Sequence, residues 1–79
     1  MPGWNGAPIV PPERRLGNRL REARAAAGLT QAQLADLAGV SRKTINTVEN
    51  RVFIPSTLLA LRLARALGAA VETLFFLEG

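Results

Sequence analysis

The sequence contains no cysteine and no histidine, and these two absences exclude several kinds of protein. Without cysteine the chain forms no disulfide, and without either residue the usual zinc sites cannot be built. The acidic residues are few and scattered, so no nucleophile–base pair and no metal cluster is visible. We therefore expect a protein that is not an enzyme and that needs no cofactor and no metal.

The chain also lacks long apolar runs. No stretch approaches the roughly 20 apolar residues that a membrane helix needs, and the N-terminus lacks the basic and apolar regions of a signal peptide. The 79 residues, 48% of them apolar, predict one small domain with a marginal core. The net charge of +4 favours an anionic partner, either nucleic acid or an acidic protein surface. A soluble cytoplasmic protein is the expectation.

Proline is concentrated at the N-terminus. Four of the five prolines lie within residues 1–12, together with Gly3 and Gly6, and this composition forbids a helix. We interpret residues 1–12 as a Pro/Gly-rich tail, either flexible or laid as an arm across the domain or a partner subunit. A DNA minor-groove arm is disfavoured because no Arg or Lys precedes Arg14. The folded domain is expected at residues 13–79.

Residues 30–50 predict two short helices joined by a tight turn. Thr30 and Gln33 form a capping-box pattern, Gly39 suits the positive φ at a helix end, and Ser41 is the expected N-cap of the second helix. Apolar residues at helical spacing form one buried stripe: Leu34, Ala35, Ala38, Val40, Ile45 and Val48. The outward face of the second helix carries basic, hydroxyl and amide groups without a carboxylate: Arg42, Lys43, Asn46, Thr47 and Asn50.

This stretch resembles the helix-turn-helix of the lambda-repressor and Cro family, also called the xenobiotic-response-element type. The resemblance rests on the small residue Ala35, the turn glycine Gly39 and the apolar stripe, and it extends from about residue 18 to residue 75. It implies an all-α fold, namely a compact five-helix lambda-repressor-like DNA-binding domain with a central helix-turn-helix. It also implies a sequence-specific transcriptional regulator whose partner is double-stranded DNA.

The resemblance further implies roles for individual residues. The second helix would enter the major groove, and its base-contacting candidates are Arg42, Lys43, Asn46 and Thr47. Arg and Lys suit guanine, and Asn suits adenine. The phosphate-contacting candidates are Gln31, Ser41, Asn50 and Arg51. A partly buried ion pair between Arg24 and Glu49 is expected to position the second helix.

One departure from the family concerns the end of the second helix. Many relatives have glycine where this chain has Arg51. Two explanations stay open. Either Asn50 adopts the left-handed conformation, or Arg51 adopts it with mild strain.

Three further helices are expected around the central unit. The first begins near residues 12–13, or at Asn18 because Gly17 weakens the first turn, and ends at Gly28. Its inward stripe is Leu16, Leu20, Ala23 and Ala27. A helix over residues 56–67, capped by Ser56 and stopped by Gly68, should turn four residues to the core: Ala60, Leu61, Ala64 and Leu67. Leu58 and Leu59 add apolar surface beyond this stripe, Phe53 and Ile54 are expected as lids over the core, and a last helix spans about 70–76.

The remaining apolar residues exceed what one small core can cover. Leu58, Phe76 and Leu77 are therefore expected to form a homodimer interface, with packing inside the subunit as the alternative for Phe76 and Leu77. Such a dimer would bind a near-palindromic operator, with its recognition helices about 34 Å apart. The short chain favours a repressor. An antitoxin or adaptor-type protein-interaction module on the same fold is the alternative function.

Overall fold

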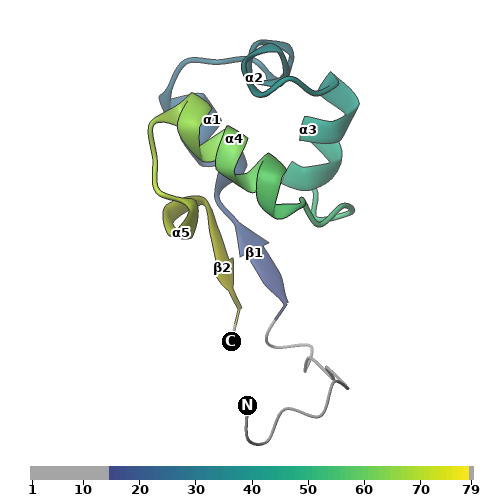
Figure 1. The fold of residues 1–79 in the computed structure, drawn as a ribbon, viewed down its shortest axis with the longest axis vertical. Helices are drawn as coiled ribbons and strands as arrows, with labels where there is room; N and C mark the ends of the chain where they lie inside the picture. The colour runs from purple at the N-terminus through teal and green to yellow at the C-terminus, as the bar shows by residue number, and fades with distance from the viewer. Residues whose placement is uncertain (1–14, 79) are drawn as a thin grey trace, which may run out of the picture.

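The computed structural model describes residues 15–78, and within them the chain forms five helices and a two-stranded antiparallel sheet. The elements follow in the order β1 (Leu16–Asn18), α1 (Leu20–Ala26), α2 (Gln31–Ala38), α3 (Arg42–Glu49), α4 (Thr57–Leu67), α5 (Val71–Leu74) and β2 (Phe75–Leu77). Figure 1 shows the helices gathered above a narrow ribbon made of β1 and β2. The expected compact five-helix fold is confirmed, with the small sheet as an addition. The interpretation of residues 1–12 concerns a segment outside the described residues.

Local capping signals set the bounds of the central helices. Thr30 and Gln33 form the predicted capping box at the start of α2, and Ser41 Oγ accepts a hydrogen bond from the backbone of Thr44 at the start of α3. Gly39 ends α2 with a φ of 73°, a left-handed conformation that glycine adopts without a side-chain clash. The predicted helix-turn-helix is therefore present with the expected start, turn and stop.

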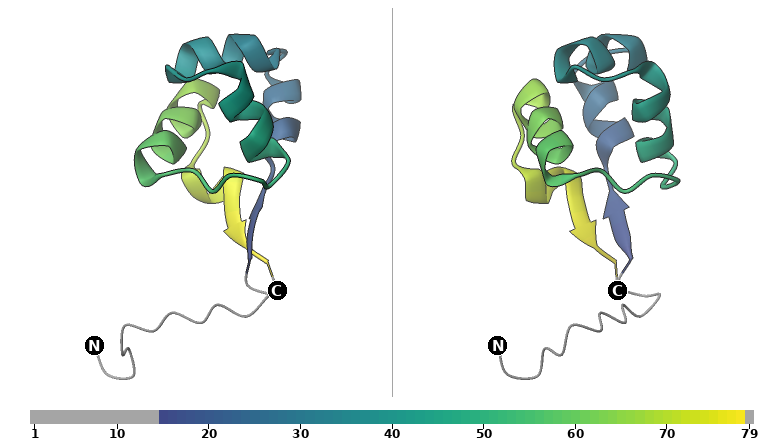
Figure 2. Two further views of the ribbon diagram at one scale, coloured as in Figure 1. Left: turned by 90° about the vertical axis from the view of Figure 1, so that its right-hand side faces the viewer. Right: turned by 45° about the vertical axis from the view of Figure 1, so that its right-hand side comes forward.

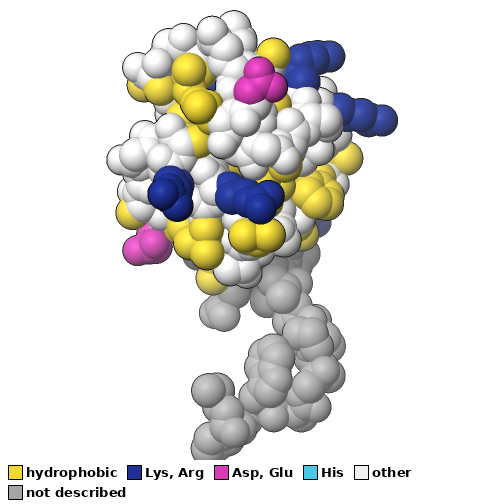
Figure 3. Space-filling view, turned by 45° about the horizontal axis from the view of Figure 1, so that its top comes forward, with side chains coloured by type: hydrophobic (Ala, Val, Ile, Leu, Met, Phe, Trp, Pro, Cys, Tyr) yellow, Lys and Arg dark blue, Asp and Glu magenta, His cyan; other side chains and the backbone are white. Residues whose placement is uncertain are grey.

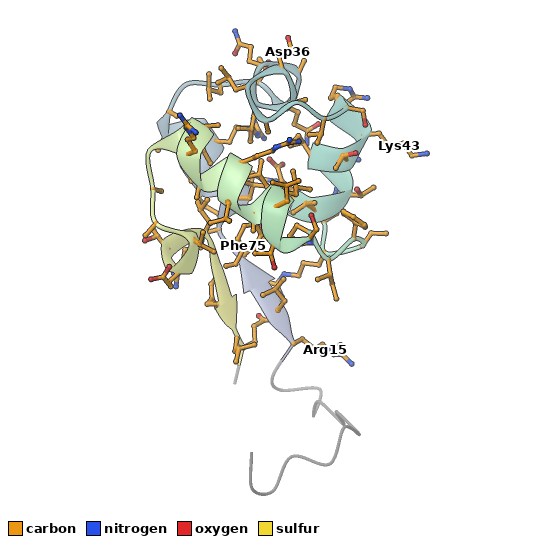
Figure 4. All side chains as sticks on the ribbon, in the orientation of Figure 1. Arg15, Asp36, Lys43 and Phe75 are labelled. Carbon is orange, nitrogen blue, oxygen red and sulfur yellow. The ribbon has the colours of Figure 1, made fainter. Side chains whose placement is uncertain are left out.

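The core lies between α1, α2, α3, α4 and α5. Its largest fully buried side chains are Leu20, Leu34, Ile45, Val48, Leu63 and Leu74. In Figure 4 the side chain of Phe75 points toward this core from the start of β2, and it is 8% exposed. Burying these groups removes apolar surface from water, and each Å² of apolar surface buried stabilises the fold by about 25 cal/mol.

The predicted inward face of α4 is partly wrong. Leu59, Ala60, Leu63 and Ala64 are buried, whereas Leu61 is 54% exposed. These four residues occupy one helix face by the i, i+4 spacing, and Leu61 lies off that face.

Two other inward predictions also fail. Phe53 and Ile54 are 46% and 73% exposed and therefore do not act as lids over the core. Ala27, expected inward, is exposed at the C-cap of α1.

The two ends of the described chain pair with each other, which the sequence analysis did not predict. β1 lies antiparallel to β2 with Gly17 opposite Phe76, and all the views in Figures 1 and 2 show the two strands side by side. A Cβ atom on Gly17 would lie 2.5 Å from Phe76 Cε2, so the glycine leaves the space that the phenylalanine ring occupies.

This ribbon corrects the predicted bounds of two helices. The first helix begins at Leu20 rather than near residues 12–13, because the chain is extended through Asn18, whose Oδ1 accepts a hydrogen bond from the Leu20 backbone. The last helix ends at Leu74 because Phe75 is already extended, with a φ of −127° and a ψ of 137°. Within residues 15–78, no helix has the length and apolarity to cross a membrane.

Candidate nucleic-acid interface

The outward face of α3 is exposed and carries donors of hydrogen bonds. Arg42, Lys43 and Asn46 are exposed, and Thr47 is half-buried with its hydroxyl donating to the Thr44 carbonyl at 2.9 Å. The labelled side chain of Lys43 projects from α3 away from the body of the protein in Figure 4. Figure 3 shows basic side chains at the edge of the molecule that belongs to α3, and others over α4.

The single carboxylate of α3 is turned inward and neutralised. Glu49 has a fully buried side chain, and its Oε2 accepts a hydrogen bond from Arg24 Nε at 2.7 Å. Arg24 also donates from Nη2 to Glu49 Oε1 at 3.3 Å and from Nη1 to the Leu29 carbonyl at 2.9 Å. The ion pair expected from the resemblance is therefore present, and it connects α1, the start of α2 and the end of α3.

Burial alone would raise the pKa of Glu49, because a carboxylate loses its hydration inside the protein. The hydrogen bonds from Arg24 and Gln31, with the positive charge of Arg24, outweigh that penalty and hold the pKa of Glu49 below its ordinary value. The same hydrogen bond raises the pKa of Arg24. Glu49 is consequently ionised at neutral pH, and its charge is matched inside the protein.

Arg21 is a further member of this cluster, and the sequence did not single it out. Arg21 Nε lies 3.4 Å from Glu49 Oε1, and its Nη2 donates to Asn50 Oδ1 at 2.9 Å. The available signal was its spacing, because Arg21 and Arg24 are three residues apart and thus share one side of α1.

Gln31 connects the start of α2 to the exposed face of α3. It accepts a hydrogen bond from Arg42 and donates to Asn46 and Glu49. Asn50, at the end of α3, donates to both the backbone carbonyl and the side-chain oxygen of Asn46. Four of the eight candidates therefore belong to one hydrogen-bonded network with α1: Gln31, Arg42, Asn46 and Asn50. The other four lie outside it, since Ser41 and Thr47 bond to Thr44 and Arg51 to Glu78, while Lys43 projects from the body.

Arg51 ends α3 in the left-handed conformation, with a φ of 62°. Its backbone N–H donates to the Val48 carbonyl, and that of Val52 donates to the Thr47 carbonyl, which is the Schellman pattern. Of the two explanations left open by the sequence, the strained arginine is the one observed, since Asn50 has a φ of −89°. Arg51 Nη1 also lies 2.7 Å from Glu78 Oε1, a partner that sequence reasoning missed.

The three residues expected at a dimer interface differ in exposure. Leu58 and Leu77 are 58% and 72% exposed, whereas Phe76 is half-buried. The Phe76 ring packs against Gly17, and the Arg19 guanidinium carbon lies 4.5 Å from its centroid, a cation–π arrangement. The ring of Phe76 is thus partly used within the subunit.

A capped helix, a glycine turn and a second helix with an exposed cationic face together define a helix-turn-helix DNA-binding domain. The helix-turn-helix family model matches residues 20–74. The chain belongs to the lambda-repressor and Cro type of helix-turn-helix transcriptional regulators.

Relatives of known sequence and structure are similar over most of their length. The chain is 38% identical over 61 residues to YgzD of Bacillus subtilis, an uncharacterized HTH-type transcriptional regulator, covering 77% of this chain and 92% of YgzD. It is 47% identical over 60 residues to an uncharacterized HTH-type regulator of Methanothermobacter thermautotrophicus, covering 75% of this chain and 87% of that protein.

Two solved structures have the same arrangement of helices. The restriction-modification controller protein C.AhdI of Aeromonas hydrophila is 40% identical with a TM-score of 0.68, over 70% of this chain and 83% of that one. The P22 c2 repressor in complex with a synthetic operator is 30% identical with a TM-score of 0.66, over 68% of this chain and 82% of that one.

Proposed function

We propose that the protein is a transcriptional repressor that binds a near-palindromic operator as a homodimer, with α3 as the recognition helix in the major groove. The observation that carries this proposal is the inward position of Glu49, whose side chain is fully buried against Arg24. Because α3 contains no other acidic residue, the face that it offers to a partner is cationic and amide-bearing. Such a face suits the phosphates and base edges of DNA.

We assign base contacts to Arg42, Lys43, Asn46 and Thr47, which lie along one side of α3. Arg42 and Lys43 begin the helix, and the N-terminal residues of a recognition helix are those that reach base edges. We assign phosphate contacts to residues that flank this side at the starts of α2 and α3 and at the end of α3: Gln31 through its backbone N–H, Ser41 and Arg51. Asn50, the fourth candidate, donates its side-chain and backbone N–H groups to Asn46 and so has no free donor for phosphate. Phosphate contacts would set the register of the protein on DNA, and base contacts would set the sequence.

We propose that Leu58 and Leu77, with the exposed part of Phe76, pair two subunits. Leu58 and Leu77 leave more than half of their surface exposed, and their burial in a dimer would remove apolar surface from water. The protein would act in the cytoplasm through binding rather than catalysis. Sedimentation analysis should give twice the mass of the 79-residue chain, and Leu77→Lys should reduce it to one chain.

A binding titration against duplexes selected from a random pool tests the DNA-binding function. Affinity should fall as salt rises, because phosphate contacts release counterions. The double variant Arg42→Ala, Lys43→Ala should lose sequence preference while remaining folded. The matched control is Arg62→Ala, Arg65→Ala, which removes the same charge from the exposed side of α4. Equal effects of the two double variants would contradict the assignment of α3 as the reading surface.

A second candidate function is an antitoxin or adaptor that binds another protein. The observation in its favour is the exposed apolar segment that follows α3, where Val52 and Ile54 are 77% and 73% exposed. Co-expression with the product of a neighbouring gene would reveal a stable complex under this function. Loss of that complex in a Val52→Ser, Ile54→Ser variant would assign the segment to it.

A further inference from the structure

Two side-chain amides beside Asn46 have orientations that charged partners determine. Gln31 Oε1 accepts from Arg42 Nη1 at 3.3 Å, and Gln31 Nε2 donates to Glu49 Oε1 at 3.1 Å. An arginine side chain can only donate, and an ionised carboxylate can only accept. The amide of Gln31 therefore cannot be turned over without facing donor with donor and acceptor with acceptor.

Asn50 is oriented in the same way from the other end of α3. Its Oδ1 accepts from Arg21 Nη2 at 2.9 Å, and its Nδ2 donates to the backbone carbonyl of Asn46 at 2.9 Å. The guanidinium again has only donors, and the carbonyl only lone pairs. Asn50 therefore presents its second N–H, and not its oxygen, to the side chain of Asn46.

Both neighbours direct a hydrogen atom to the same atom of Asn46. Gln31 Nε2 lies 3.3 Å and Asn50 Nδ2 lies 3.0 Å from Asn46 Oδ1. A side-chain carbonyl oxygen has two lone pairs, and here both are used. Within residues 15–78, Asn46 Nδ2 donates to no side chain and to no backbone group. Asn46 is also exposed. Asn46 thus offers two donors and no acceptor to a ligand.

We propose that Asn46 selects guanine, a conclusion that rests on the DNA-binding function proposed above. Asparagine normally reads adenine with one donor and one acceptor, placed against N7 and the N6 amino group. In this protein both lone pairs of Asn46 Oδ1 already accept hydrogen bonds. The N6 amino group of adenine would therefore find no free acceptor on Asn46. Guanine presents N7 and O6, two acceptors side by side, whereas thymine presents only one acceptor, O4, beside a methyl group. The network of Arg21, Gln31 and Asn50 therefore sets the base preference of Asn46.

Selection of bound duplexes from a random pool, with the wild type and with Asn46→Ala, identifies the base pair that Asn46 contacts. The position that loses preference in Asn46→Ala should carry guanine in the wild-type selection. Replacing that guanine by 7-deazaguanine, which lacks the N7 acceptor, should weaken wild-type binding about fivefold or more and leave Asn46→Ala unaffected. Thr73→Ala, on the exposed side of α5, is the matched control.

A second variant tests the role of the network. Asn50→Ala frees one lone pair of Asn46 Oδ1, so the guanine-to-adenine preference at that position should fall. This ratio is independent of a uniform loss of phosphate contact. Adenine, cytosine or thymine at the position, or a preference that Asn46→Ala leaves unchanged, would overturn the inference while DNA binding stands. Failure to select any duplex would overturn the DNA-binding function itself.

Discussion

Replacing Glu49 with glutamine is predicted to lower the free energy of unfolding by about 2–3 kcal/mol. Removing one partner of a buried ion pair costs about 3–5 kcal/mol, because the other charge is left in the interior. Arg24 is that charge, with 16% of its side chain exposed and its donors directed at Glu49. Glutamine keeps one acceptor oxygen in a side chain of the same shape, so the expected loss lies below the full range.

Thermal unfolding followed by circular dichroism measures this effect. In a domain of this size, 1 kcal/mol corresponds to about 4–8 °C in Tm, so Glu49→Gln should lower the Tm by roughly 10–20 °C. Urea unfolding should show a lower midpoint with an unchanged slope if the folded and unfolded states keep their compactness.

Two controls separate the buried pair from ordinary charge removal. Glu78→Gln breaks the half-exposed ion pair with Arg51 and should cost less than about 1 kcal/mol. The double variant Arg24→Gln, Glu49→Gln leaves no unmatched charge between these positions, so its loss should be smaller than the sum of the two single losses. If Glu49→Gln and Glu78→Gln cost the same small amount, the reasoning about the buried pair is refuted.

Three further predictions concern the pH dependence of the Glu49 pair, the backbone at Arg51 and the packing at Gly17. The pKa of Glu49 is lower in the folded than in the unfolded protein, so its contribution to stability is present above the unfolded pKa of about 4.3 and is lost as the pH falls through the folded pKa. Urea unfolding from about pH 6 to about pH 2 should show this loss, with a shallower pH dependence in Glu49→Gln. Arg51→Gly relieves the strain of a left-handed backbone conformation, about 1–2 kcal/mol, and loses an exposed ion pair. Urea unfolding should therefore show a free energy of unfolding raised by about 0.5–1 kcal/mol. A lower free energy of unfolding would mean that the ion pair contributes more than the strain. Gly17→Ala should cost about 1–3 kcal/mol, because its Cβ would overlap the Phe76 ring, and the NMR signals of that ring should shift; an unchanged spectrum would contradict the packing.

The central helices were predictable from sequence because their ends depend on nearby residues. Thr30 with Gln33, Ser41, and the glycines at 39 and 68 act within one turn of the bond that they make, so their signals survive without tertiary context.

The ribbon was not predictable in this way. Its two strands have three residues each and gain their hydrogen bonds from a partner about sixty residues away along the chain. A segment this short has no periodicity to recognise. Gly17 was a correct sign against a helix, but the reason for it, the ring of Phe76, lies in the tertiary structure.

The inward face of α4 was mispredicted for a different reason. Leucine occurs on several sides of this helix, at 58, 59, 61, 63 and 67, so apolar spacing alone does not select one face. Contacts with α2 and α5 make the selection, and they bury Leu59 and Leu63 rather than Leu61.

Within the site, the resemblance supplied Arg24 and Glu49 as a pair, whereas Arg21 and Glu78 went unnoticed. The directions of the hydrogen bonds around Asn46 could also not be predicted from the sequence, because the orientation of a side-chain amide depends on which of its neighbours can only donate or only accept. Arg21 on α1 and Arg42 on α3 are brought to the two ends of that network by folding alone.

The ribbon of β1 and β2 also brings the two ends of the described residues side by side. The backbone N–H of Glu78 donates to the carbonyl of Arg15 at 2.7 Å, so the first and last described residues are neighbours. In a variant that carries only residues 15–78, a short linker would join these two residues, and new termini opened at the exposed Gly28 or Gly68 would give a circularly permuted protein. In such a permutant α3 would keep its setting, while the strand pairing would become a local hairpin instead of a long-range closure.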